Sequence, residues 1–206
     1  MIPGGSPATA SSAFARPSPR RPARDELNAA TQERGYVVVL TGDGKGKTTS
    51  ALGMAMRAIG QGLKVAVLQF IKGSWRYGEL ATAERLAPDL TIRPLGEGFV
   101  HVDPEHPDPK DVLCAERAWE VCKETLFSGD YGMVILDEIN IAISYGLLAA
   151  DDVAAALRQR PPELHVVLTG RDAHPQILEL ADYVTEMREV KHPYAAGLIA
   201  RKGIEY

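Results

Sequence analysis

The residues best suited to chemistry lie in the stretch 41–49, which reads TGDGKGKTT. It follows the apolar, β-branched run 36–40, which is typical of a buried strand. It precedes a segment with helical spacing of the apolar residues Leu52, Ala55, Met56 and Ile59. A strand, a glycine-rich loop, Gly-Lys-Thr and a helix together are the context of a phosphate-binding P-loop. We therefore predict that this stretch binds the phosphates of a nucleotide.

Each residue type in the loop suits phosphate binding. Glycines let backbone N–H groups approach phosphate oxygens closely, and the helix N-terminus adds unpaired N–H groups and its dipole. Lys47 supplies a positive charge, and the Thr48 hydroxyl can ligate Mg²⁺, which takes oxygen ligands. We predict nucleotide contacts from the loop residues Gly42, Asp43, Gly44, Lys45, Gly46, Lys47, Thr48 and Thr49.

The loop departs from the usual P-loop spacing at one position. The standard form has a glycine five residues before Gly46, where this chain has Thr41. The first glycine comes one residue later, so we expect a tighter loop. The alternative is a glycine-rich turn with two surface lysines, but the flanking strand and helix favour the P-loop.

A second signal is the apolar run 133–136, which ends in Asp137 and Glu138 about 90 residues after the P-loop. A buried strand that ends in carboxylates is the Walker B form. Such carboxylates lie beside the P-loop and hold Mg²⁺ directly or through water.

Strand and helix patterns alternate along the rest of the chain, which predicts a mostly parallel sheet covered on both faces. We predict one P-loop NTPase-like (RecA-like) α/β/α domain. The expected strands are 36–40, 64–70, 90–95, 133–138, 164–168 and 183–190. The expected helices are one that follows the P-loop and ends at 60, and others at 79–87, 110–127, 151–158 and 174–181. Trp119 is expected in the core.

Composition is that of an ordinary globular chain of 206 residues, with a formal net charge of −4 and 45% hydrophobic residues. There is no basic excess to indicate nucleic acid, and no apolar run reaches the roughly 20 residues of a membrane span. Cys114 and Cys122 are about 12 Å apart along a predicted helix, too far for a disulfide with each other. We expect packed thiols in a reducing cytoplasm, with no nucleic-acid or membrane partner.

The first 24 residues contain five prolines and no acidic residue. Proline at this density prevents a continuous helix, and there is little to bury, so we predict disorder. The same prolines argue against an amphipathic transit peptide. We therefore divide the chain into a Pro/Arg-rich tail at 1–34, with room for a short helix from 25, and a P-loop domain at 35–206.

From about residue 34 to its end, the chain closely resembles the ATP:corrinoid adenosyltransferases of cobalamin synthesis and salvage. The short P-loop is the family's form, and the resembling stretches occur in the family's order. They are TGDGKGKTT at 41–49, QFIKGSW at 69–75, GF at 98–99, VILDE at 134–138, TGR at 169–171, LAD at 180–182, VKH at 190–192 and GIEY at 203–206.

The resemblance implies transfer of the 5′-deoxyadenosyl group of ATP to reduced cobalt, with triphosphate released and the nucleotide reversed in the P-loop. It implies that Lys47 and Glu138 are catalytic. It implies that Thr48 and Glu138 are direct ligands of Mg²⁺ or Mn²⁺, with Asp137 nearby. Arg57 resembles a nucleotide-contacting arginine of the family; the alternative is a surface charge.

The long irregular stretch 96–109 contains two residues that the resemblance assigns to the corrinoid. Phe99 matches an aromatic below the corrin that displaces the lower axial ligand of cobalt. His101 stands where the family often has tryptophan, so it either packs similarly or ligates cobalt, which would oppose reduction. From the residues alone, this stretch fits a solvated acidic loop better than a zinc site. The resemblance also implies a homodimer and an external electron donor such as a reduced flavoprotein.

Two other functions remain open at this point. One is a P-loop NTPase or kinase that hydrolyses or transfers the γ-phosphate. The other is a nucleotide-regulated binding module without turnover. The product from ATP separates them: triphosphate indicates adenosyl transfer, and ADP with phosphate indicates an NTPase.

Overall fold

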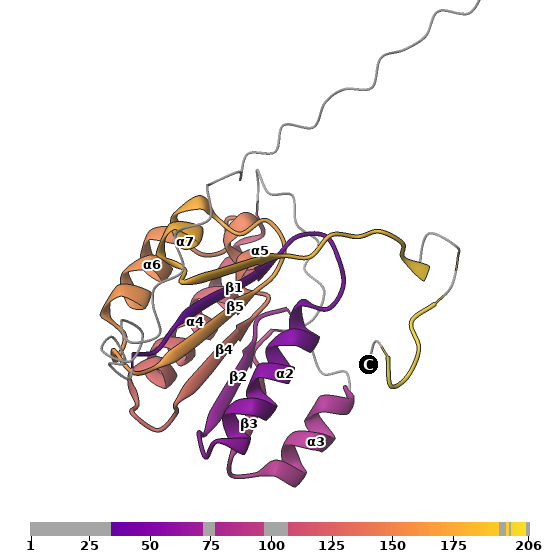
Figure 1. The fold of residues 1–206 in the computed structure, drawn as a ribbon. Helices are drawn as coiled ribbons and strands as arrows, with labels where there is room; N and C mark the ends of the chain where they lie inside the picture. The colour runs from indigo at the N-terminus through magenta and orange to yellow at the C-terminus, as the bar shows by residue number, and fades with distance from the viewer. Residues whose placement is uncertain (1–33, 72–76, 97–106, 194–196, 198, 205–206) are drawn as a thin grey trace, which may run out of the picture. The chain divides into compact units, whose positions relative to one another are not determined.

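The computed structural model describes residues 34–71, 77–96, 107–193, 197 and 199–204 (Figure 1). All of them fall in one compact unit, residues 33–206. The predicted disordered tail up to residue 33 lies outside the described residues, as do Phe99 and His101. No helix of the described residues is long and apolar enough to cross a membrane.

Six strands form a single parallel sheet in the order β3-β2-β4-β5-β1-β6. They are β1 (Val37–Thr41), β2 (Val65–Gln69), β3 (Leu90–Pro94), β4 (Met133–Asp137), β5 (His165–Thr169) and β6 (Tyr183–Glu186). Strands β1, β2 and β4 are buried along their whole length, as expected for a sheet covered on both faces. The predicted parallel sheet is confirmed.

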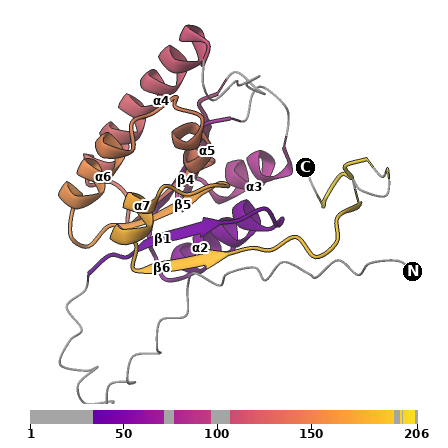
Figure 2. The same cartoon turned by 90° about the horizontal axis from the view of Figure 1, so that it is seen from above.

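Helices cover both faces of this sheet (Figure 2). They are α2 (Lys47–Gly60), α3 (Gly78–Leu86), α4 (Pro109–Phe127), α5 (Ile139–Ser144), α6 (Ala150–Gln159) and α7 (Pro175–Leu180). One core cluster joins α4, α5, α6 and α7 to one face, and a second joins α2 and α3 to the other. Successive residues of β1 alternate between the clusters, because side chains along a strand point to opposite faces. The α/β/α architecture is therefore confirmed.

The structure corrects three details of the predicted elements. Met56 is 69% exposed, because α2 packs on the sheet through the smaller Ala51, Ala55 and Ala58 instead. Helix α5 was not expected, since its residues continue the apolar run of β4 without a helical start signal. Strand β6 ends at 186 rather than 190, and it is exposed along its whole length at the edge of the sheet.

The long helix α4 buries Trp119 and Cys122, as expected of core residues. Burial raises the pKa of the Cys122 thiol, so this side chain stays a neutral packing group. Cys114 is partly buried, and neither cysteine forms a disulfide among the described residues.

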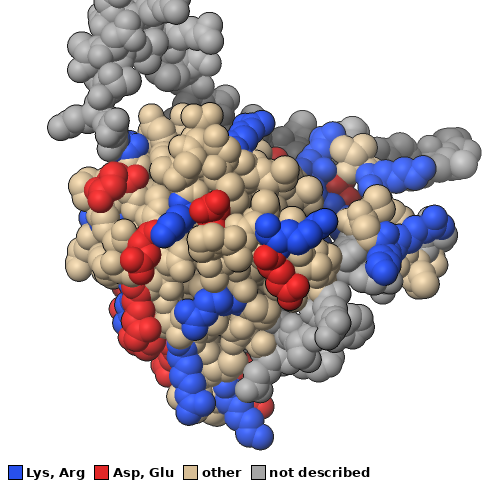
Figure 3. Space-filling view, turned by 90° about the horizontal axis from the view of Figure 1, so that it is seen from below, with Lys and Arg blue, Asp and Glu red and all other residues tan. Residues whose placement is uncertain are grey.

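Figure 3 shows acidic and basic side chains interspersed on the face seen from below.

Candidate nucleotide-binding site

The P-loop is built where β1 ends and α2 begins. Gly42 and Gly46 have φ values of 89° and 108°, which favour glycine. The loop also lies against the segment after β6, since the Gly44 N–H donates to the Met187 carbonyl at 2.7 Å. A Cβ at Gly42 would lie 2.5 Å from that same oxygen. Two glycines of the loop therefore permit a close backbone contact as well as a turn.

Lys47 begins α2 and is only 8% exposed. Its Nζ donates to the carbonyl oxygens of Gly42 and Gly44, at 2.7 and 2.8 Å. Burial lowers the pKa of this ammonium, and the nearby Glu138 carboxylate acts in the opposite direction. The lysine thus lies folded across the loop, at the point where a P-loop holds phosphate.

Asp137 is a fully buried carboxylate at the end of β4, and it accepts hydrogen bonds from the side chains of Thr48, Thr169 and Gln69. The hydroxyls of Thr48 and Thr169 both reach Oδ1, at 2.8 and 2.7 Å. Gln69 Nε2 reaches Oδ2 at 3.1 Å. The four residues come from α2, β5, β2 and β4, so this cluster fixes the P-loop helix to the carboxyl edge of the sheet.

Glu138 is the residue between β4 and α5, and its backbone is left-handed, with φ 64° and ψ 18°. Such a conformation costs a non-glycine residue about 1–3 kcal/mol and occurs at functional sites. Its N–H donates to Thr169 Oγ1 at 2.9 Å, and its side chain lines the cavity over the P-loop.

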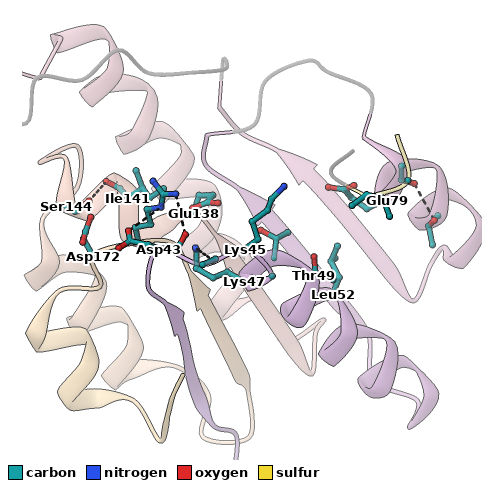
Figure 4. Close-up of a pocket in the computed structure, with 18 of the residues that line it drawn as sticks. Asp43, Lys45, Lys47, Thr49, Leu52, Glu79, Glu138, Ile141, Ser144 and Asp172 are labelled. Carbon is teal, nitrogen blue, oxygen red and sulfur yellow. Dashed lines mark hydrogen bonds and ion pairs between the residues drawn. The ribbon is translucent and has the colours of Figure 1, made fainter. Parts of the chain in front are cut away.

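A cavity of about 750 Å³ opens over the P-loop (Figure 4). Figure 4 shows Lys47 and Glu138 near the middle of its wall, with Asp172 and Ser144 on one side and Leu52 on the other. The volume is in the range of pockets that enclose a drug-sized ligand, which is also the size class of a nucleoside triphosphate. The predicted loop residues from Asp43 to Thr49 all line this cavity.

Several functional candidates escaped the sequence-based reasoning. Gln69 and Thr169 are polar residues that each end a buried strand. A polar residue at the carboxyl end of a buried strand was the sequence signal that could have indicated both. Arg171, which follows in the Thr-Gly-Arg stretch, lines the cavity and lies with its Nε 3.7 Å from Asp43 Oδ1. Glu79 and Thr82 of α3 line the other end, and nothing in their local pattern pointed to a ligand.

The C-terminal segment also reaches this cavity, through Gly203 and Ile204. A turn presents them, because the N–H of Ile204 donates to the Arg201 carbonyl at 3.1 Å. Gly203 has φ 79°, the value that a type II turn requires at its third residue.

Comparison with known proteins decides the family. The model of the family described as "ATP:corrinoid adenosyltransferase BtuR/CobO/CobP" matches residues 33–206. The chain belongs to this family. The enzyme is 44% identical over 182 residues to the corrinoid adenosyltransferase of Pseudomonas aeruginosa, covering 88% of this chain and 89% of that one. It is 42% identical over 177 residues to that of Escherichia coli K12, covering 86% and 88% of the two chains.

Among solved structures, the enzyme is similar to the KaiC-like protein PH0186 of Pyrococcus horikoshii. The TM-score is 0.43 at 13% identity, covering 77% of this chain and 75% of that chain.

Arg57 lies away from the cavity. This residue is exposed in the last turn of α2, about 15 Å along the helix from Lys47, and it is not among the cavity-lining residues. Its nucleotide contact stays a prediction. The corrinoid contacts of Phe99 and His101 also stay predictions.

The oxygen atoms around Thr48 fit a hard divalent cation. Mg²⁺ is usually held by one or two carboxylates, a hydroxyl and substrate phosphates rather than by an all-protein cage. The site offers the Thr48 hydroxyl and the Glu138 carboxylate, with Asp137 behind them. In the part of the chain that the structure describes, no group of three or more His, Cys, Asp or Glu forms a metal cluster. Asp137 is fully buried, so its position suits orienting Thr48 more than contacting a metal.

Proposed function

We propose that this enzyme transfers the 5′-deoxyadenosyl group of ATP to the cobalt of a corrinoid and releases triphosphate. The observation that carries the proposal is the family match over residues 33–206. The site geometry supports it, because a P-loop lysine, the Thr48 hydroxyl and the Glu138 carboxylate line one cavity of about 750 Å³, with Asp137 hydrogen-bonded behind Thr48.

In this reaction cobalt(I) supplies the electron pair. A cobalt–carbon bond forms at C5′ of the ribose while the bond from C5′ to the triphosphate oxygen breaks. The whole triphosphate leaves, so negative charge grows on it in the transition state. No protein nucleophile or general base is needed.

The residues of the P-loop stabilise that leaving group. In this proposal the Lys47 ammonium and the positive, N-terminal end of α2, both at the cavity, stabilise the charge that develops on the triphosphate. Preorganised donors of this kind typically contribute about 10²–10³-fold each. For Lys47 to serve in this way, its hydrogen bonds to the Gly42 and Gly44 carbonyls must give way in part to phosphate oxygens.

We propose that Mg²⁺ or Mn²⁺ accompanies ATP, held by Thr48 and Glu138. Such an ion supplies charge neutralisation to a leaving phosphate. Asp137 accepts the hydrogen bond of Thr48 and so orients the hydroxyl. Glu138 brings a carboxylate to the same cavity from the end of β4.

The remaining parts of the proposal rest on the family resemblance. Phe99 excludes an axial ligand from the lower face of the corrin, and His101 shares that face. The enzyme acts as a homodimer in the cytoplasm and takes the electron that makes cobalt(I) from a donor such as a reduced flavoprotein. We expect Arg57 to contact the nucleotide.

The experiment combines the purified enzyme, Mg-ATP and a chemically reduced corrinoid, and follows the absorbance of the corrinoid. Formation of the adenosylated corrinoid, dependent on both enzyme and ATP, supports the proposal. Steady release of ADP and phosphate with no change in the corrinoid would favour an NTPase instead. ATP binding with no product of either kind would favour a binding module.

A further inference from the structure

Thr169 stands at the centre of the site without lining its cavity. It is the last residue of β5, which lies between β4 and the P-loop strand β1, and it is completely buried. Its hydroxyl lies between two acidic residues of the neighbouring strand end.

The hydrogen bonds of this hydroxyl have one consistent arrangement. A threonine hydroxyl has one hydrogen to donate and lone pairs to accept with. Thr169 Oγ1 donates to Asp137 Oδ1 at 2.7 Å and accepts from the N–H of Glu138 at 2.9 Å. It therefore connects the side chain of one acidic residue to the backbone of the next.

The same Asp137 oxygen also accepts the hydroxyl of Thr48 at 2.8 Å. A continuous path of hydrogen bonds thus runs from Thr48 through Asp137 and Thr169 to the backbone of Glu138. Bonds in such a path polarise one another, and buried networks hold their members in one arrangement.

The bond to Glu138 bears on a strained backbone. Glu138 is left-handed, with φ 64°, and this conformation decides where its side chain starts. An acceptor fixed on β5 holds the Glu138 N–H in place, so Thr169 stabilises the conformation that directs this carboxylate to the cavity.

We propose that Thr169 is a positioning residue for the metal–nucleotide site: through one hydroxyl it sets both the Thr48 hydroxyl and the Glu138 carboxylate. The inference rests on the proposed function, because it assigns these two residues to the metal ion that accompanies ATP. Residues that orient metal ligands in this way typically change metal affinity or activity by roughly 10–100-fold when replaced.

A threonine at the matching end of the neighbouring strand β1 makes a different contact. Thr41 ends β1 in the same way and is also nearly buried. Its hydroxyl instead accepts the N–H of Ala173 at 3.3 Å, from the loop before α7.

The test compares Thr169→Val, which keeps the shape and loses both hydrogen bonds, with Thr169→Ser, which keeps the hydroxyl. Thr169→Ala is a second variant without the hydroxyl, in case valine prevents folding. Thr125→Val is the matched control, because it removes a partly buried threonine hydroxyl from α4 that, among the described residues, bonds the Val121 carbonyl at 2.8 Å and no part of the site. Calorimetry measures the Kd of ATP with Mg²⁺ and with EDTA, and turnover gives kcat and KM.

We expect Thr169→Val and Thr169→Ala to weaken ATP binding in Mg²⁺ about 10-fold or more. Their affinity for ATP in EDTA should stay within about 3-fold of the wild-type value. Thr169→Ser and Thr125→Val should stay within about 3-fold of the wild-type affinity in both Mg²⁺ and EDTA. Equal losses with and without Mg²⁺ would show a merely structural role and overturn the inference, as would a folded Thr169→Val variant with normal Mg²⁺-dependent binding. If the wild-type enzyme forms no adenosylated corrinoid, the proposed function fails, while the binding comparison still decides the role of Thr169.

Discussion

The hydroxyl of Thr48 donates to Asp137 Oδ1 at 2.8 Å, and this bond joins residues 89 positions apart in the chain. It connects the first turn of the P-loop helix to the end of the central strand β4. Since Asp137 also accepts from Gln69 and Thr169, the position of Thr48 depends on three strands of the sheet as well as on its own loop.

Asp137→Asn tests whether charge or hydrogen bonding matters at this position. The Asn oxygen still accepts both threonine hydroxyls. Its amide then faces Gln69. The Oε1 of Gln69 is buried with no hydrogen-bond partner among the described residues, and it can accept from the new amide once the Gln69 amide turns. We expect a Tm near that of the wild type and at least a 10-fold loss of Mg²⁺-dependent ATP affinity, measured by thermal denaturation and calorimetry. Wild-type Mg²⁺-dependent affinity would show that the carboxylate charge is not used.

Glu138 is proposed as a ligand of the metal ion, and its backbone is also strained. Two variants test these two features separately. Both Glu138→Ala and Glu138→Gly remove the carboxylate, so both should require more Mg²⁺ for turnover while the KM for the corrinoid changes little. Only glycine relieves the left-handed conformation, which costs other residues about 1–3 kcal/mol. We expect Glu138→Gly to unfold at a temperature at least equal to that of Glu138→Ala. A clearly lower Tm for glycine would contradict the strain, and a change confined to the corrinoid KM would contradict the metal assignment.

Because the C-terminal turn lines the cavity, we predict that it contacts the nucleotide. Alanine substitutions at two glycines of the C-terminal segment test this contact. Gly203 (φ 79°) and Gly197 (φ 73°) are both left-handed, and an added Cβ would meet nothing within 4 Å at either site. Only Gly203 lines the cavity. Gly203→Ala should therefore distort the turn and raise the KM for ATP several-fold, while Gly197→Ala should not. Equal KM values in steady-state assays of the two variants would show that the turn does not contact the nucleotide.

Because the pKa of His165 is lowered in the folded protein, we predict that the free energy of unfolding depends on pH. Its Nδ1 accepts the N–H of Tyr36 at 3.1 Å, and burial, with a smaller effect of Arg160, lowers the pKa of the imidazole. The unfolded chain therefore binds the proton more readily. The contribution of His165 is present above the unfolded value near 6.5 and is lost as the pH falls through that value toward the lower folded pKa.

We expect the Tm of the wild type to fall more between pH 7 and pH 5 than that of His165→Asn, whose side-chain oxygen accepts the same N–H without titrating. Parallel Tm curves for the two proteins would show that His165 does not titrate on unfolding.

The sequence predicted the parts of the site that depend on local pattern. The P-loop and its helix follow from the glycines, Lys47 and the apolar runs around them. Asp137 and Glu138 were recognisable because a buried strand ends in two carboxylates. The parallel sheet followed from the alternation of strands and helices.

The rest depends on contacts between distant segments. Gln69 and Thr169 belong to the site only because β2 and β5 lie on either side of β4. Met187 packs against the P-loop because β6 pairs with β1 at the sheet edge, and no local pattern indicates either pairing. Helix α5 was missed because tertiary packing overrides the β-branched character of its sequence.

The central claim is that the whole triphosphate is the leaving group, and phosphorus NMR of the reaction with cobalt(I) corrinoid tests it most directly. We predict that triphosphate appears in proportion to adenosylated corrinoid. Lys47→Ala should form neither while remaining folded, because Lys47 lies across the loop that holds the leaving group. Lys123→Ala, on the exposed surface of α4, should match the wild type. ADP and phosphate as the products, or a Lys47→Ala enzyme with near-normal triphosphate release, would contradict the account.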